Sequence, residues 1–251
     1  MPMLAALILP VLAQAAPEPK WTTIFNGKNL SGWTPKIAGY DLGDNFGNTF
    51  RVVNGVIQVN YDKYGGEFKG RFGYLFYKSK FSNYVLRLEY RFTGEQCPGA
   101  PDWAWRNSGI MLHGQDPKTV KKDQYWLVSS EFQLLGGPKE GERPTGNLCT
   151  PGILVRMNDK IITDHCINST SETYRGDQWV KAEVEVHGSG PIIHRINGRE
   201  VIRYDEVQYD PSDAEAKPLI KNGKVMLSEG SISLQSESHP CEFRNIQIRK
   251  I

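Results

Sequence analysis

The β class of the chain is clearest in the stretch Tyr84-Val85-Leu86-Arg87-Leu88-Glu89-Tyr90-Arg91-Phe92, where apolar and polar residues alternate over a long run. Successive side chains of a β-strand point to opposite faces, so the apolar residues at even positions from 84 to 92 share one face. The opposite face carries Arg87, Glu89 and Arg91. This alternation predicts a strand with one face in the core and the other face polar.

A second stretch, Asn107-Ser108-Gly109-Ile110-Met111-Leu112-His113, follows the same rule. Ile110 and Leu112 form its apolar face, whereas Asn107, Met111 and His113 point the other way. The stretch therefore predicts another strand that offers an amide and an imidazole on its polar face.

The third stretch is Glu131-Phe132-Gln133-Leu134-Leu135-Gly136-Gly137, in which Glu131 and Gln133 lie on the face opposite to Phe132 and Leu134. If the three strands are neighbours in one sheet, their polar faces bring Glu131, His113 and Glu89 to one site. An antiparallel sheet with an ordinary solvated face shows the same alternation, so the pattern by itself leaves both interpretations open.

The rest of the chain contains many short strands separated by Gly and Asn turns. Asn54-Gly55 and Asn197-Gly198 each separate two β-rich runs, which predicts hairpins with type I′ turns. Helical periodicity is confined to a turn or two near residues 211–216. These features predict an all-β protein built as a sandwich of two antiparallel sheets.

Size and charge limit the possible functions. The 251 residues are 39% hydrophobic and show no linker, which predicts one β domain over residues 17–251. The 30 basic and 28 acidic residues are interspersed and give a net charge of +2, so we expect neither nucleic acid nor a membrane as partner. An aromatic content of 11% suits a carbohydrate partner, since flat rings stack on sugar faces.

The first residues, 1–16, resemble a secretory signal peptide. Leu4–Leu12 is an apolar run, and Ala13-Gln14-Ala15 fits the small residues that precede a cleavage site, although no Lys or Arg precedes the run. The run is too short to span a membrane. We expect a secreted or periplasmic protein.

Four cysteines, Cys97, Cys149, Cys166 and Cys241, allow two disulfides with three connectivities. Pairing of Cys149 with Cys166 is favoured because a hairpin-sized segment separates them, and four buried free thiols are the alternative. No C-x-x-C pair is present, so no motif supports a metal site and no cofactor is expected. A divalent cation stays chemically attractive for the reaction considered below.

Two long irregular segments are candidate site loops. Residues 93–106 contain Trp103, Trp105 and Arg106, which argue against disorder and favour a role at the rim of a site. Residues 141–170 contain His165, which is either a further site residue or a structural loop residue.

Six motifs carry a family likeness. They resemble, in the same order, the 3-keto-disaccharide hydrolase domain family, and the likeness covers nearly all of residues 21–251: Phe25-Asn26-Gly27-Lys28-Asn29-Leu30-Ser31-Gly32-Trp33, Glu89-Tyr90-Arg91-Phe92, Asn107-Ser108-Gly109-Ile110, Glu131-Phe132-Gln133, Ile196-Asn197-Gly198 and Phe243-Arg244-Asn245-Ile246. The resemblance implies a concanavalin A-like jelly-roll sandwich whose concave sheet forms a carbohydrate groove. It also implies that Glu131 and Gln133 face this groove.

The same resemblance implies hydrolysis of 3-keto-glycosides or 3-keto-disaccharides. The ketone acidifies the hydrogen on C2, so a base can remove it and expel the glycosidic oxygen from C1, after which water adds back. We expect Glu131 and His113 to act as base and acid, in either order. The remaining candidates bind the substrate or line the entrance: Glu89, Arg91, Trp103, Trp105, Arg106, Asn107, Gln133 and His165.

Two alternatives compete with this mechanism. A conventional glycoside hydrolase would use two carboxylates that flank the bond, for example Glu131 with Glu89. A lectin-like module would need the aromatic rim and a polar groove but not Glu131. The 3-keto substrate would also require a sugar-oxidising oxidoreductase earlier in the pathway.

Overall fold

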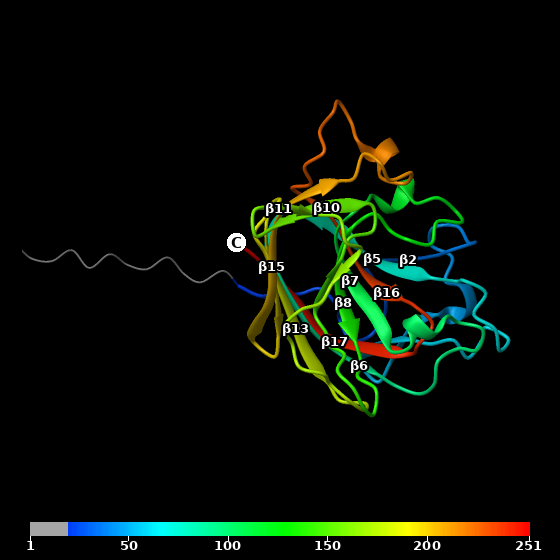
Figure 1. Ribbon diagram of the computed structural model, residues 1–251. Helices are drawn as coiled ribbons and strands as arrows, with labels where there is room; N and C mark the ends of the chain where they lie inside the picture. The colour runs from blue at the N-terminus through cyan, green and yellow to red at the C-terminus, as the bar shows by residue number, and fades with distance from the viewer. Residues whose placement is uncertain (1–19) are drawn as a thin grey trace, which may run out of the picture.

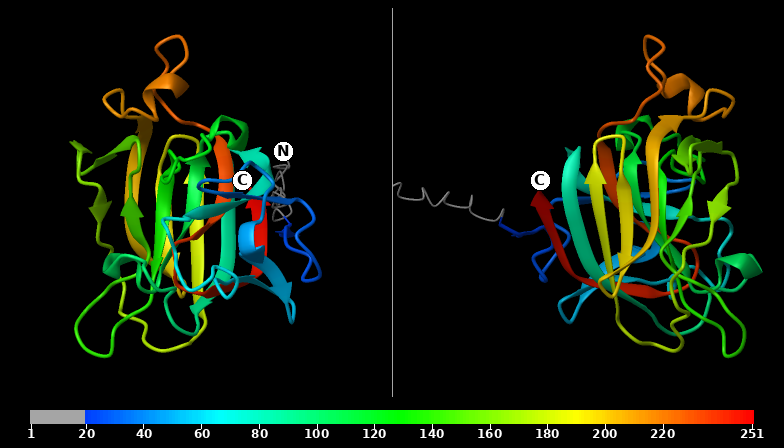
Figure 2. Two further views of the ribbon diagram at one scale, coloured as in Figure 1. Left: turned by 90° about the vertical axis from the view of Figure 1, so that its right-hand side faces the viewer. Right: turned by 60° about the vertical axis from the view of Figure 1, so that its left-hand side comes forward.

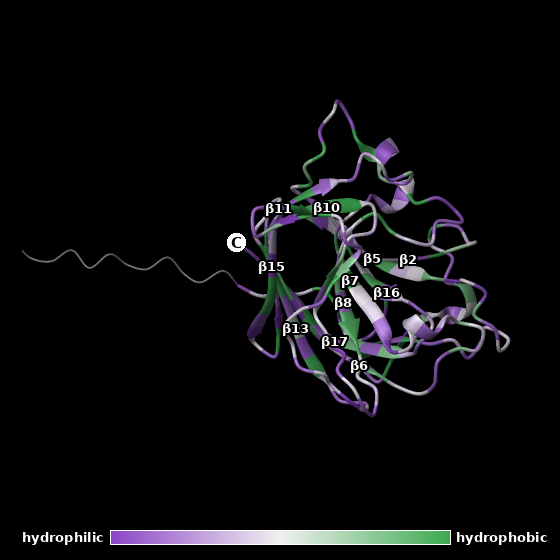
Figure 3. Ribbon diagram, viewed as in Figure 1, coloured by the Kyte–Doolittle hydropathy of each residue, from purple (hydrophilic) through white to green (hydrophobic). Residues whose placement is uncertain are grey.

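Two antiparallel β-sheets stack against each other in the computed structural model, which describes residues 20–251 (Figure 1). The predicted signal peptide lies outside the described residues. The sheets enclose one hydrophobic core, and the concanavalin A-like sandwich expected from the resemblance is confirmed. Figure 3 shows hydrophobic residues concentrated in the strands, whereas the connecting loops are mostly hydrophilic.

The larger sheet has ten strands. Strand β1 (Thr22–Thr23) pairs with β17, and the other nine follow the order β11 (Lys160–Ile162), β10 (Ile153–Met157), β15 (Arg199–Tyr209), β14 (Ile192–Ile196), β13 (Val180–His187), β6 (Asn83–Phe92), β17 (Cys241–Lys250), β4 (Val56–Val59) and β3 (Phe50–Val53).

The smaller sheet has seven strands, and its outer side faces the viewer in the left panel of Figure 2. Their order is β12 (Cys166–Ile167), β9 (Asn147–Cys149), β8 (Ser130–Leu135), β7 (Asn107–Gly114), β16 (Gly230–Ser236), β5 (Gly73–Phe81) and β2 (Trp33–Ile37). The short 3-10 helices are η1 (Phe46–Asn48), η2 (Asp102–Ala104), η3 (Pro117–Thr119) and η4 (Lys217–Leu219). No helix within residues 20–251 is long and apolar enough to cross a membrane.

Both predicted hairpins are confirmed. Asn54 and Gly55 connect β3 to β4, and Asn197 and Gly198 connect β14 to β15. All four residues have positive φ, between 49° and 83°, as a type I′ turn requires.

The structure also contains the favoured disulfide, Cys149–Cys166, which joins β9 to the edge strand β12. Cys97 and Cys241 are free and buried.

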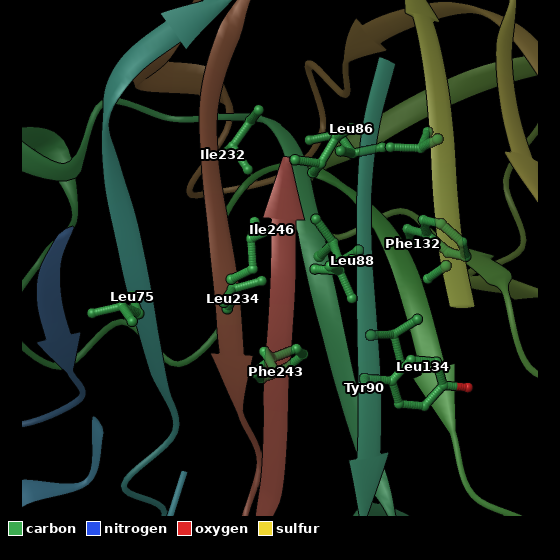
Figure 4. Packing of buried hydrophobic residues seen from close by; sticks show 14 of the residues in the cluster. Leu75, Leu86, Leu88, Tyr90, Phe132, Leu134, Ile232, Leu234, Phe243 and Ile246 are labelled. Carbon is green, nitrogen blue, oxygen red and sulfur yellow. The ribbon is translucent and has the colours of Figure 1, made fainter. Parts of the chain in front are cut away.

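The expectation that three polar strand faces share one sheet is wrong. Strands β7 and β8 are neighbours in the smaller sheet, but β6 belongs to the larger one. Leu88 of β6 and Phe132 of β8 both point into the core between the sheets (Figure 4). The polar residues that alternate with them must therefore point to opposite outer sides of the sandwich.

Candidate functional site

A cavity of about 400 Å³ lies on the outer face of the smaller sheet. Its floor includes Asn107 of β7 and Glu131 and Gln133 of β8. These polar residues alternate along their strands with residues that face the core. Gly109 lies opposite Gln133 in the register, and a Cβ atom added at Gly109 would be 2.7 Å from Oε1 of Glu131. The glycine therefore leaves the space that the Glu131 carboxyl group occupies.

A second carboxyl group, that of Glu237, lines the same cavity. Glu237 comes directly after β16 and is 3% exposed, while Glu131 is 6% exposed. Burial raises the pKa of Glu131 to about 8. Burial also raises the pKa of Glu237, and the negative charge of Glu131 raises it further. Two carboxyl groups in this arrangement ionise one after the other, so the pair can hold a single proton.

Arg143 supplies a positive charge beside the pair and lowers the pKa of Glu237. Its guanidinium donates hydrogen bonds to four backbone carbonyls, those of Trp105 at 2.6 Å, Gly136 at 3.0 Å, Trp103 at 3.3 Å and Arg106 at 3.4 Å. These bonds tie the 103–106 segment to the end of β8. Arg143 therefore acts on the shape of the cavity as well as on its charge.

Aromatic rings form the rim. Trp103 and Trp126 are 50% and 40% exposed, and their ring centroids are 5.7 Å apart. The Tyr74 hydroxyl donates to the Tyr125 carbonyl at 2.9 Å and accepts from the Leu127 amide at 3.1 Å, which fixes the loop that carries Trp126. Large exposed rings beside buried polar groups are typical of a site that binds a ligand with both apolar and hydroxylated faces.

Polar side chains complete the cavity wall. Gln133 accepts a hydrogen bond from Asn147 at 2.9 Å, whereas Oδ1 of Asn107 and Oε2 of Glu237 are buried without a partner among the described residues. His165 enters from the segment that the disulfide holds against β9. Buried polar atoms without partners are costly unless a ligand satisfies them, so these two oxygens mark positions for ligand hydroxyl groups.

The structure separates His113 from this cavity. The backbone of His113 has φ of +49°, and the pairing between β7 and β16 shifts register there. This bulge interrupts the alternation, and Nε2 of His113 lies 2.7 Å from the carbonyl of Gly188, which follows β13 of the other sheet. Burial lowers the pKa of the ring. His113 is therefore not positioned to act with Glu131.

Glu89 and Arg91 also lie elsewhere, on the outer face of the larger sheet. Glu89 forms an ion pair with Arg244 at 2.7 Å, and Arg91 forms one with Glu242 at 2.7 Å. Strand alternation correctly predicted that both side chains point away from the core. They point away from the other sheet, however, because β6 belongs to the larger sheet. Their predicted part in a shared site with Glu131 is wrong.

Trp105 and Arg106 line a neighbouring pocket rather than the cavity of Glu131. Of the ten predicted site residues, Glu131, Trp103, Asn107, Gln133 and His165 come together in one cavity.

The sequence reasoning missed Glu237, Arg143, Tyr74 and Trp126. Continuing the outward positions of β16 from Ser233 and Gln235 leads to Glu237, so a signal for that residue was present. Within residues 20–251 no group of three or more His, Cys, Asp or Glu side chains could hold a metal ion.

Residues 20–249 match the model of the 3-keto-alpha-glucoside-1,2-lyase-like domain. A 3-keto-disaccharide hydrolase of Bacteroides thetaiotaomicron is 24% identical over 255 residues, which cover 91% of this chain and 78% of that protein.

Solved structures agree on the fold. A candidate glycosyl hydrolase from Parabacteroides distasonis superposes with a TM-score of 0.54 at 17% identity, covering 92% of this chain and 100% of that one. The exoplasmic domain of VIP36, bound to Ca²⁺ and Man3GlcNAc, superposes with a TM-score of 0.50 at 7% identity, covering 94% of this chain and 91% of that one.

Proposed function

Because the chain belongs to the 3-keto-alpha-glucoside-1,2-lyase-like family of carbohydrate-acting proteins, we propose that it cleaves the glycosidic bond of 3-keto-glycosides or 3-keto-disaccharides. The observation that carries this proposal is the pair of buried carboxyl groups, Glu131 and Glu237, in one cavity with an aromatic rim. Such a pair supplies both a proton acceptor and a proton donor, which elimination followed by hydration requires.

Glu131 acts as the base in this mechanism. It removes the proton from C2, and the electron pair forms an enolate with the C3 ketone. The enolate then collapses, the C1–O bond breaks and a C1–C2 double bond forms. Water later adds a hydroxyl group to C1 and a proton to C2, so the overall reaction is hydrolysis.

Glu237 donates the proton to the leaving oxygen. The negative charge of Glu131 raises the pKa of Glu237, which keeps Glu237 protonated while Glu131 is ionised. Glu237 takes the role first expected of His113. The positive charge of Arg143 stabilises the anionic pair and the developing enolate.

Substrate binding uses the rest of the cavity. Asn107, Gln133 and His165 hold sugar hydroxyl groups, and Trp103 and Trp126 pack against the faces of the sugar or its leaving group. No step here depends on a metal ion, and retention of activity after exhaustive chelation is the expected result.

The substrate must first be oxidised at C3, so an oxidoreductase acts before this protein. Export to the periplasm or the medium, as residues 1–16 indicate, would bring the protein to its carbohydrate substrates.

One assay in D₂O tests the function and the mechanism together. The purified protein is incubated with a 3-keto-disaccharide and, in parallel, with the unoxidised disaccharide. We expect monosaccharide release from the oxidised substrate alone, with one deuterium incorporated at C2 of the 3-keto product. The Glu131→Gln variant is the control and should release no monosaccharide from either disaccharide.

Two other outcomes would replace the proposal. Release of monosaccharide from both disaccharides, without deuterium at C2, would indicate a conventional glycoside hydrolase. Glu131 and Glu237 would then be its two carboxyl groups. Binding of both sugars without any release would indicate a lectin-like module.

A further inference from the structure

A second pocket, of about 350 Å³, lies beside the candidate site and has a different chemistry. Three cationic side chains line it, Arg106, Lys139 and Arg175, together with a single carboxylate, Glu95. Arg106 is paired with Asp177 at 2.7 Å. Neither Lys139 nor Arg175 has a carboxylate partner within 4 Å among the described residues, so the pocket keeps an excess of positive charge.

His239 forms the buried end of this pocket. The side chain is 1% exposed, and neither ring nitrogen has a hydrogen-bond partner within residues 20–251, although the Gly94 backbone lies near enough to raise the pKa of the ring. Nε of Arg106 is likewise buried without a partner. Native structures rarely leave buried polar atoms unsatisfied, and a bound ligand that accepts from Arg106 and from the ring N–H of His239 is one explanation.

The ring environment fixes which form of His239 is present. Burial is the largest cause that lowers the pKa of His239, to about 4, and the positive charge of Arg106 adds to it. The neutral ring offers one N–H donor at neutral pH. A donor at the closed end of a pocket with cationic walls suits a small ligand that carries an oxyanion.

We propose that this pocket binds a small carboxylate- or phosphate-bearing molecule. Lys139 and Arg175 attract and hold the anion at the mouth, Arg106 and His239 donate to its oxygens inside, and the Trp105 ring covers one wall. The proposal does not depend on the chemistry proposed for Glu131.

Trp105 connects the pocket to the candidate site. Its ring contacts His239 edge to face, with centroids 5.9 Å apart, and its carbonyl accepts the shortest hydrogen bond of Arg143. An anion that orders Trp105 would therefore also order the segment that Arg143 holds at the cavity rim. The same chain segment forms a wall of both pockets.

The test measures binding of three probes to the full-length protein by isothermal titration calorimetry: inorganic phosphate, glucuronate and glucose. We expect phosphate, glucuronate or both to bind with an affinity that depends on the cationic residues of this pocket. Any binding of glucose should not depend on these residues, because glucose carries no oxyanion. Binding of phosphate alone would identify a phosphate site, and binding of glucuronate alone a site for sugar acids. Each charge-assisted hydrogen bond contributes enough that Arg175→Gln with Lys139→Gln should weaken anion binding by about 10-fold or more.

Lys28→Gln with Arg199→Gln is the matched control, because it removes the same charge from two exposed residues outside the pocket. Its anion affinity should equal that of the wild type. His239 provides two further readouts. The His239→Gln variant should lose anion affinity, and in the wild type the C2–H and C4–H NMR signals of His239 should shift when the anion is added. Equal affinity in the pocket and control variants, or no shift of the His239 signals at saturating anion, would overturn the proposal.

Discussion

The carboxyl groups of Glu131 and Glu237 share one cavity, although one comes from the middle of β8 and the other from the end of β16. Burial raises the pKa of both groups, and the charge of Glu131 adds to the shift of Glu237. Paired carboxyl groups whose protons leave at different pH values are a recurrent source of acid and base in one site.

Glu131→Gln should reduce kcat on a 3-keto-disaccharide by about 100-fold or more, since the base is removed while the size of the side chain is kept. The matched control is Glu89→Gln, on the outer face of the opposite sheet, which should keep wild-type activity. Initial rates of aglycone release measure both. Equal losses in the two variants would show that the site has been assigned to the wrong sheet face.

Glu237→Gln should affect substrates according to their leaving groups. A disaccharide needs a proton on its departing oxygen, so its rate should fall by about 100-fold, whereas a 3-keto nitrophenyl glucoside should be nearly unaffected. The ratio of kcat values for the two substrates measures the effect. An equal loss on both substrates would argue against Glu237 as the acid.

Activity and stability should respond to pH in opposite directions. The base works when ionised, so kcat/KM should rise as pH approaches about 8, the pKa of Glu131. The same raised pKa favours the folded state below pH 4.5, and that contribution is lost as pH rises to about 8. Glu131→Gln should therefore gain stability relative to wild type over this interval, as urea unfolding at several pH values would reveal.

Arg143→Lys should keep the charge but lose the planar guanidinium that donates from Nη1 to Trp105 and Gly136 and from Nη2 to Trp103. We expect a higher KM and a loss of about 1 to 3 kcal/mol in the free energy of unfolding, since buried carbonyls lose a charged donor. Denaturant unfolding and steady-state kinetics measure the two effects. A wild-type KM would exclude Arg143 from shaping the rim.

Reduction of Cys149–Cys166 should destabilise the protein by about 2 to 4 kcal/mol, because the bond closes a loop with a sequence separation of 17. The bond also holds His165 at the cavity wall, so KM should rise as well. Dithiothreitol should change the urea midpoint of the wild type and leave that of Cys166→Ser unchanged. A shift of the same size in Cys166→Ser would point instead to the other cysteines.

The sequence by itself determined the β class, the two hairpins and the direction of most side chains. Strand alternation and turn chemistry are local properties. Where the hydrogen-bonded pairing of strands is regular, every second side chain faces the core and the others face the surface. Glu131, Gln133 and Asn107 were therefore placed on an outer face correctly. The same rule failed at His113, because a bulge in β7 is a response to the pairing with β16 and has no signature in the alternation.

Only the tertiary structure decided which outer face each polar residue reached. Glu89 and Glu131 show equally good alternation, yet β6 and β8 lie in opposite sheets and their carboxyl groups point to opposite sides of the core. The partner that Glu131 does meet, Glu237, comes from a strand far along the chain. Strand order depends on long-range packing of the whole core, and alternation within one strand does not encode it.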